Sequence, residues 1–163
     1  MHSIDRSRRH LAIAAAGLAG YVDAVGFLTA DRYFVSFMSG NTTRLGVDLI
    51  VAPRTAAIPA LLIAGFLGGV VGGALVAAKA GARRKFAVLT LVAALLAGAS
   101  GMSHADLAAP TLALLVLAMG ALNNTFQKGG EVSVGLTYMT GALVRFGQGL
   151  AAKLTGRAGS GSR

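Results

Sequence analysis

The chain has 163 residues, of which 55% are hydrophobic and only 13% are charged, and its mean hydropathy is +0.68. Because a soluble globular domain carries about 25% charged residues, this composition excludes an ordinary soluble domain. The net charge of +9 would fit a nucleic-acid partner, but thirteen of the fifteen Lys and Arg flank or separate apolar runs, which is typical of basic loops beside membrane spans. We therefore expect the lipid bilayer as the partner, and no nucleic acid.

Six apolar stretches approach the length of about 20 residues that a helix needs to cross the hydrocarbon core. They cover residues 11–30, 34–52, 56–78, 86–102, 107–127 and 132–152. The connections between them are too short to hold a separate domain. The sequence thus predicts an all-α integral membrane bundle of about six hydrophobic helices, with residues 1–154 as a single transmembrane domain. Residues 155–163, mostly Gly, Ser and Arg, are expected to form a disordered basic tail.

The first stretch, 11–30, resembles a secretory signal peptide because Arg6, Arg8 and Arg9 precede it. Its apolar run is longer than that of a signal peptide, so we expect a retained first span. The stretch contains Asp23. A charge inside a span costs about 2.5 to 3.5 kcal/mol even on lenient insertion scales, so Asp23 needs a partner or a water-filled cavity.

The second stretch, 34–52, contains several polar side chains within apolar sequence. Five small or hydrogen-bonding residues run from Ser39 to Thr43 and include Asn41 and Thr42. Such a run weakens an apolar helix and can turn backbone groups toward a cavity. Arg44 and Asp48 lie four residues apart and therefore share one helical face. The alternative interpretation is a local Arg–Asp ion pair that only helps the helix to insert.

The third and fourth stretches, 56–78 and 86–102, lack charged and amide side chains. In the third, glycines recur every four residues in two overlapping ladders, formed by Gly65, Gly69 and Gly73 and by Gly68 and Gly72. Small residues at this spacing let helix backbones approach closely in lipid. The ladders predict a tight helix contact, either within the chain or with a second subunit of a homo-oligomer.

The fifth and sixth stretches also carry polar side chains inside apolar sequence. The fifth contains Asn123, Asn124 and Gln127, and the sixth contains Arg145 and Gln148. Together with the second stretch, these residues are predicted to line a polar pathway. The alternative is that the amides are interhelical hydrogen bonds, each contributing on the order of 1 kcal/mol.

The chain is similar to itself at an offset of 101 residues. Met38, Gly40, Arg44 and Gly46 align with identical residues, and Asp23 falls opposite Asn124. Arg44 therefore corresponds to the arginine of the sixth stretch. Internal repeats are common in transporters, which place their sites near the repeat interface.

The same residues carry a family resemblance. The segments G-Y-V-D-A-V-G-F-L and F-V-S-F-M-S-G-N-T-T-R-L-G, between residues 20 and 46, resemble the hallmark of the YoaK-like (DUF1275) membrane proteins. The segments A-M-G-A-L-N-N-T-F and T-Y-M-T-G-A-L-V-R-F-G resemble that family's second conserved region. The resemblance implies a multi-pass protein of the bacterial inner membrane with about six helices. It implies no substrate, and this chain is shorter than typical members.

The distribution of basic residues leaves two topologies open. If all six stretches cross and the amino terminus is inside, seven basic residues lie inside and six outside. If 34–52 and 132–152 are broken or re-entrant, eleven basic residues lie inside and two lie outside, as the positive-inside rule favours. Stretch length and the family resemblance favour six crossings.

Other chemistries have no support in the sequence. Cysteine is absent, and His2, His10 and His104 have no partner at ligand spacing, so we expect no metal site. There is no Walker-type loop, no paired carboxylate and no histidine inside a span. We therefore expect neither an enzyme nor a bound cofactor.

The sequence favours a small transporter or channel for a polar solute, with arginine chemistry that suits an anionic group. The alternative is a non-transport interaction or assembly protein that is packed through its glycine ladders. The predicted solute-binding residues are Asp23, Ser39, Asn41, Thr42, Arg44, Asp48, Asn123, Asn124 and Arg145.

Overall fold

The computed structural model describes residues 6–29, 32–125, 127–128, 131–132 and 139–154. Within these ranges the α-helices are α1 (Arg6–Thr29), α2 (Met38–Val51), α3 (Ala57–Ala80), α4 (Arg84–His104), α5 (Ala108–Leu122) and α6 (Met139–Leu154). Two 3-10 turns, η1 (Gly81–Arg83) and η2 (Asn123–Thr125), follow α3 and α5. The strands β1 (Gln127–Lys128) and β2 (Glu131–Val132) pair antiparallel. The predicted basic tail, 155–163, lies outside the described residues.

The predicted helical membrane architecture is confirmed. Three helical stretches are long and apolar enough to cross a membrane: His10–Thr29, Ala57–His104 and Ala108–Thr125. The second of these has 48 residues and contains both α3 and α4, of 24 and 21 residues, which fold back on each other at η1. Gly81 permits this reversal because its φ is 51°, a conformation that glycine adopts at little cost. The number of crossings stays a prediction.

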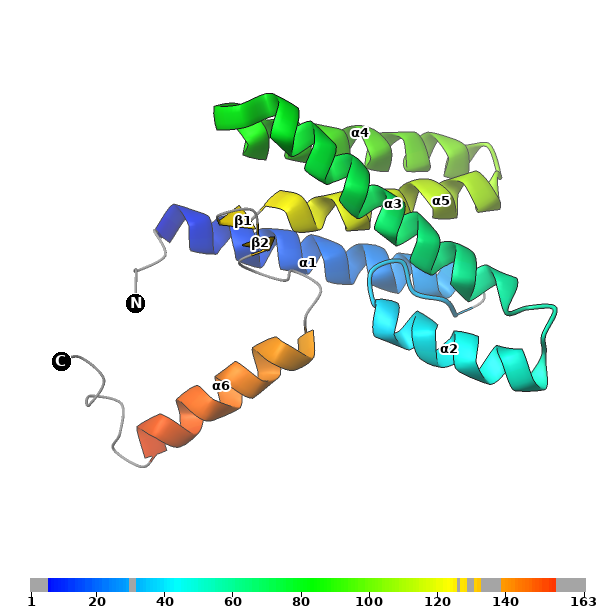
Figure 1. Cartoon of the computed structure of the whole chain (residues 1–163), viewed down its shortest axis with the longest axis horizontal. Helices are drawn as coiled ribbons and strands as arrows, with labels where there is room; N and C mark the ends of the chain where they lie inside the picture. The colour runs from blue at the N-terminus through cyan, green and yellow to red at the C-terminus, as the bar shows by residue number, and fades with distance from the viewer. Residues whose placement is uncertain (1–5, 30–31, 126, 129–130, 133–138, 155–163) are drawn as a thin grey trace.

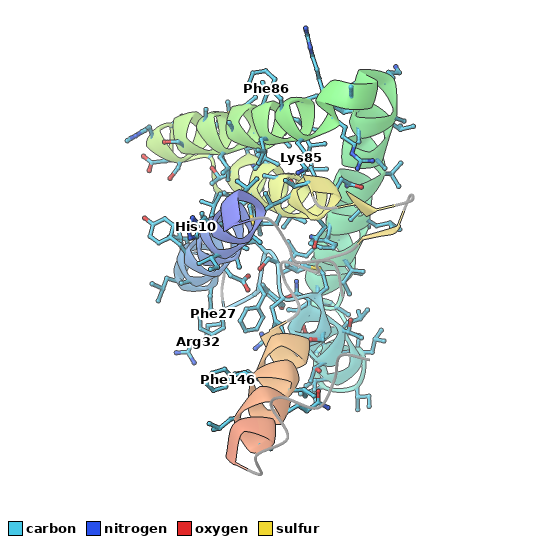
Figure 2. The ribbon with its side chains drawn as sticks, turned by 90° about the vertical axis from the view of Figure 1, so that its left-hand side faces the viewer. His10, Phe27, Arg32, Lys85, Phe86 and Phe146 are labelled. Atoms are coloured by element: carbon cyan, nitrogen blue, oxygen red, sulfur yellow. The ribbon has the colours of Figure 1, made fainter. Side chains whose placement is uncertain are left out.

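Large apolar side chains cover the outside of the helices. Leu61, Leu75 and Phe86 are 72%, 59% and 75% exposed, and Phe86 points outward from α4 (Figure 2). In water such a surface would drive association, whereas in a bilayer it faces lipid tails. The exposed apolar surface therefore fits a membrane-embedded bundle.

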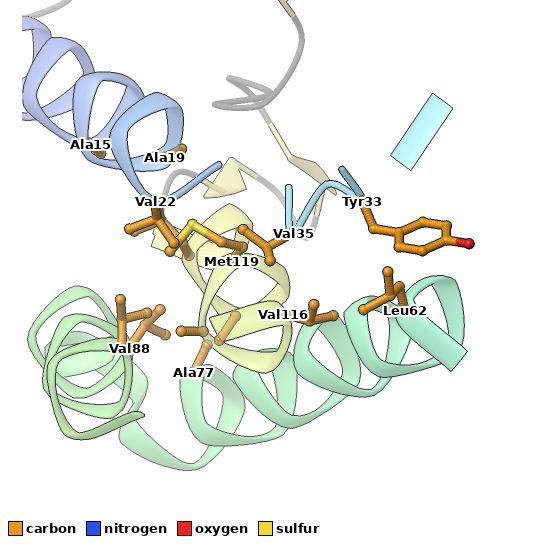
Figure 3. Packing of buried hydrophobic residues seen from close by; sticks show 14 residues of the cluster. Ala15, Ala19, Val22, Tyr33, Val35, Leu62, Ala77, Val88, Val116 and Met119 are labelled. Carbon is orange, nitrogen blue, oxygen red and sulfur yellow. The ribbon is translucent and has the colours of Figure 1, made fainter. Parts of the chain in front are cut away.

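The helices pack around α5 (Figure 1). α5 contacts α3 and α4 extensively and α1 over a smaller area, and α2 packs on α3. Met119 of α5 lies between Val22 of α1 and Val35 of the segment before α2 (Figure 3). Val35 and Met119 are completely buried. α6 lies apart from the bundle of α1 to α5 in Figure 1.

The glycine ladder forms the contact between α3 and α5. A Cβ added at Gly69 would collide with the backbone carbonyl of Leu117, and one added at Gly73 would lie 2.9 Å from Ala121 Cα. From the other side, a Cβ at Gly120 would collide with the backbone of α3. The predicted tight helix contact is confirmed for this ladder, and its partner is internal. Gly72, in the second ladder, has no such neighbour within 4 Å.

The second predicted stretch is only partly helical. Residues 34–52 were expected to form one helix, but α2 begins at Met38 and has 14 residues. At a rise of 1.5 Å per residue it is about 21 Å long, less than the roughly 30 Å of a hydrocarbon core. Residues 32–37 form a loop instead, because side chains of α1 and α2 satisfy the backbone of this loop.

Candidate functional site

Asp23 holds the loop of residues 32–37 against α1. Its Oδ1 accepts hydrogen bonds from the backbone N–H groups of Val35, at 2.8 Å, and Ser36, at 2.9 Å. Hydrogen bonds to an ionised acceptor are about twice as strong as neutral ones. The carboxylate thus gains partners that offset its position inside a span.

Asn41 holds the same loop from the side of α2. This side chain is completely buried. Its Oδ1 accepts the Phe34 N–H at 3.0 Å, and its Nδ2 donates to the Phe34 carbonyl at 2.6 Å. One amide therefore satisfies both backbone groups of Phe34, as non-helical backbone at membrane depth requires.

Two glycines let the loop pass close to both helices. The Val35 side chain packs on Gly26 of α1, where an added Cβ would lie 2.7 Å from Val35 Cγ1. The ring of Phe34 covers Gly40 of α2, where an added Cβ would lie 2.8 Å away. Phe34 also stacks on Phe27, with ring centroids 5.0 Å apart. The loop is thus packed tightly between α1 and α2.

Tyr33 separates the two charged residues of α2. Its hydroxyl donates to Asp48 Oδ2 at 3.1 Å, and the Arg44 guanidinium carbon lies 4.8 Å from the Tyr33 ring centroid. Tyr33 and Asp48 are both buried. In the part of the chain that the structure describes, no ion pair joins Arg44 to Asp48. The local Arg–Asp pair considered above is therefore replaced by a cation–π contact and a tyrosine–carboxylate hydrogen bond.

Arg44 keeps unused hydrogen-bonding capacity. Its Nε is buried and has no hydrogen-bond partner among the described residues. An arginine carries five N–H donors in a rigid fork, and the Tyr33 ring satisfies only the charge and not these donors. A buried donor without a partner costs roughly 1 to 3 kcal/mol. The guanidinium is therefore the group in this cluster that a bound anion would stabilise.

The structure brings four of the predicted residues together: Asp23, Asn41, Arg44 and Asp48 surround the loop of residues 32–37. Ser39 and Thr42 are exposed on α2, and the Thr42 hydroxyl donates to the carbonyl of Met38 at 2.9 Å. This hydroxyl is therefore used within its own helix. The weak run from Ser39 to Thr43 begins the helix and does not interrupt it.

The amides of η2 use different partners. Asn123 Nδ2 donates to the Met119 carbonyl at 3.0 Å, within its own helical segment. Asn124 Nδ2 donates to the Val70 carbonyl of α3 at 2.9 Å, and Gly73 leaves the space for it. These two hydrogen bonds lead to α5 and α3 and not to the Arg44 cluster. Asn124 thus makes the interhelical hydrogen bond of the alternative interpretation.

The side chain of Arg145 lies outside the described residues, so its role in a site shared with Arg44 stays a prediction. Tyr33 is the member of this cluster that the sequence analysis missed. A tyrosine beside a span that contains an arginine was the available signal, because the aromatic ring is one of the few partners that an apolar segment offers to a cation.

A groove of about 340 Å³ lies elsewhere, between α1, α4 and α5. Its lining is mostly apolar, with Ser100, Ser103 and His104 at the carboxyl-terminal part of α4. None of the predicted site residues line it. The groove is therefore distinct from the cluster around Arg44.

The comparisons with known proteins agree with the sequence motifs. A family model described as "Protein of unknown function (DUF1275)" matches residues 11–163. The chain is 44% identical over 150 residues to a UPF0700 transmembrane protein of Rhizobium meliloti (strain 1021), which covers 89% of this chain and 63% of the relative. It thus spans less than two thirds of the length of that relative. No solved structure matches the chain. The chain therefore belongs to the DUF1275 family of membrane proteins, as its motifs indicated.

Proposed function

We propose that the protein is a multi-pass transporter or channel for a small anionic solute in the bacterial inner membrane. The observation that carries the proposal is Arg44, whose Nε is buried without a hydrogen-bond partner in the described part of the chain. A guanidinium inside an apolar bundle is costly and marks a substrate or ion pathway more often than a structural contact. Its fork of donors fits a carboxylate or a phosphate group.

The surroundings of Arg44 support this function. The Tyr33 hydroxyl donates to Asp48, so this carboxylate of α2 has a partner other than the guanidinium. The Tyr33 ring stabilises the guanidinium through its face. The arginine is therefore oriented and keeps donors for a ligand, which is what a reversible anion site needs.

The repeat supplies a second arginine. α2 begins at Met38 and α6 begins at Met139, which is an offset of 101 residues and equals the offset of the repeated motif. Arg44 and Arg145 consequently occupy the same position in their helices. We propose that the two arginines act on the same solute, as expected for a site near a repeat interface.

The alternative function, an assembly protein packed through its glycine ladders, has less support. Gly65, Gly69 and Gly73 contact α5 of the same chain. That ladder is therefore used inside the bundle and leaves no corresponding surface for a partner.

The experiment that tests transport is uptake by purified protein in lipid vesicles. The probes are radiolabelled inorganic phosphate and radiolabelled succinate, one for each anion class. We expect uptake above that of empty vesicles and a loss of about tenfold or more in Arg44→Gln, since a hydrogen bond to a charged group contributes roughly 1.5 to 3 kcal/mol. Arg44→Lys should recover only part of the flux, because lysine lacks the fork.

The matched control is Arg54→Gln, which removes the same charge from an exposed turn and should leave the flux unchanged. A flux that survives glutamine at both Arg44 and Arg145, in protein that is folded by circular dichroism, would rule out the arginine site.

A further inference from the structure

The directions of the long helices carry information about topology. In Figure 1, α1 runs from the end of the bundle that holds η1 to the opposite end, and α4 runs the same way. α3 and α5 run in the reverse direction. The contacts of Gly65 with Val116 and of Gly73 with Ala121 confirm that α3 and α5 are parallel. In parallel helices the residue numbers of contacting pairs rise together. α3 therefore runs opposite to α1, although α2 lies between them in the chain.

The loop after α1 returns along the helix that it has just left. Phe34 contacts Phe27, Val35 packs on Gly26, and Ser36 bonds to Asp23. As the numbers rise in the loop, the numbers of its partners on α1 fall. Asp23 lies six residues before the end of α1, so the loop descends about 9 Å at 1.5 Å per residue.

α2 then runs back outward beside this loop. Its first turn places Asn41 on Phe34, and Asp48, near its end, reaches Tyr33, at the start of the loop. α2 therefore ends on the face where α1 ended. Its 14 residues are too few to cross the hydrocarbon core. The side chains of Asp23 and Asn41 form hydrogen bonds to the backbone of the descending loop, as irregular backbone at membrane depth requires.

We propose that the chain crosses the membrane four times, with α1, α3, α4 and the 18 residues of α5 and η2, and that α2 is a re-entrant arm on the periplasmic side. In this arrangement the end of the bundle that holds the start of α1 and η1 faces the cytoplasmic leaflet. The inference does not rest on the proposed transport function, because it uses helix directions, the contacts of the loop and the distribution of basic residues.

The charges of the two ends agree with this orientation. Arg32 and Arg54 belong to the end where α1 and α2 finish. The opposite end gathers seven basic residues on α1, α3, η1 and α4, namely Arg6, Arg8, Arg9, Lys79, Arg83, Arg84 and Lys85. Positive residues favour the cytoplasmic side, where anionic lipids attract each Lys or Arg by about 1 kcal/mol. Seven against two is a decisive bias for short loops.

The repeat extends the arrangement to the second half of the chain. α5 runs opposite to α1 (Figure 1). The repeated motif forms α2, which comes after α1, and α6, which comes after α5. Two equivalent arms would then enter from opposite faces of the membrane. This is an inverted repeat, the construction that places short helices around a site at the bilayer midplane.

Single cysteines flanking α2 test the topology, because the chain has no cysteine of its own. Arg32→Cys and Thr55→Cys lie before and after α2, and Ala82→Cys lies in η1; all three positions are exposed, and the Arg32 side chain points away from the helices (Figure 2). Right-side-out spheroplasts are treated with a membrane-impermeant maleimide before and after permeabilisation. We expect both Arg32→Cys and Thr55→Cys to react in intact spheroplasts, and Ala82→Cys to react only after permeabilisation.

The pair that flanks α2 is decisive. If α2 crosses, Arg32→Cys and Thr55→Cys lie on opposite faces, and reaction of only one of them in intact spheroplasts would overturn the re-entrant arm. Reaction of Ala82→Cys in intact spheroplasts would overturn the cytoplasmic orientation of the basic end. Full reaction of all three variants after solubilisation in detergent is the control for intact, unblocked thiols.

Discussion

Asp23 of α1 accepts the backbone N–H of Val35, twelve residues later in the chain, at 2.8 Å. This hydrogen bond connects a span to an irregular segment that has no secondary structure of its own. In lipid no water replaces such a partner, so the bond defines where the chain stops being helical. The carboxylate is thus a structural acceptor for the loop that positions Tyr33 and α2.

Replacement of Asp23 should destabilise the protein in a graded way. Asp23→Ala leaves two backbone N–H groups without an acceptor and should lower the free energy of unfolding by about 2 to 4 kcal/mol. Asp23→Asn keeps one acceptor oxygen and should lose about half of that. Denaturation in detergent, followed by circular dichroism, measures both. Asp106→Asn, at an exposed turn, is the control and should change little.

Asn41→Asp should be more harmful than its small change in shape implies. The substitution removes the Nδ2 donor and places a carboxylate oxygen against the Phe34 carbonyl, which Nδ2 now meets at 2.6 Å. We expect a loss of about 1 to 3 kcal/mol from the unsatisfied acceptor. The same denaturation assay checks it, with Thr43→Ser on the exposed face of α2 as the control. Equal stability of the two variants would contradict the role of Asn41.

Gly69→Ala should destabilise the contact between α3 and α5, whereas Gly72→Ala should not. The new methyl group at Gly69 meets the backbone of Leu117, which cannot move aside, while the one at Gly72 has no such neighbour within 4 Å. Overpacking of this kind costs roughly 1 to 3 kcal/mol. Gly65→Ala meets only the side chain of Val116, at 3.2 Å, and should fall between the two. Thermal unfolding of the three purified variants gives the order, and equal tolerance would argue against the ladder.

A double-mutant cycle should locate the partner of Asp48. Tyr33→Phe and Asp48→Leu, measured singly and together, should show a coupling of about 1 to 3 kcal/mol, because the Tyr33 hydroxyl donates to Asp48. The cycle of Arg44→Gln with the same Asp48→Leu should show little coupling. The reverse pattern would mean that Arg44 and Asp48 form an ion pair in the membrane.

The long apolar stretches that contain α1, α3, α4 and α5 could be predicted from the sequence because apolar composition over about 20 residues is enough to define them. The start of α2 could not be predicted from the sequence. Phe34 to Phe37 is as apolar as the helices around it, and the break depends on two distant acceptors, Asp23 and Asn41. Composition carries no record of which side chain will satisfy which backbone group.

The candidate site, too, could be predicted only in part from the sequence. Asn41, Arg44 and Asp48 share a helical face by spacing alone, and the structure gathers them around one loop. Spacing assigns a residue to a face of its own helix but not to a neighbouring helix, which is why Asn124 was grouped with them although it bonds to Val70. Tyr33 was missed for a related reason, since an aromatic residue near the end of a span commonly marks only the lipid interface.

The contact between α3 and α5 also determines how the molecule can move. Gly69 faces the backbone of α5, and Gly120 faces the backbone of α3. Two main chains in direct contact cannot slide past one another as interdigitated side chains can by changing rotamers. The two helices consequently behave as a single rigid strut. In the proposed transport cycle, an opening between the faces of the membrane would displace α1, its returning loop and α2 against this strut. The contact between α3 and α5 would then be the fixed frame, and the polar cluster lies outside it, on α1, the loop of residues 32–37 and α2.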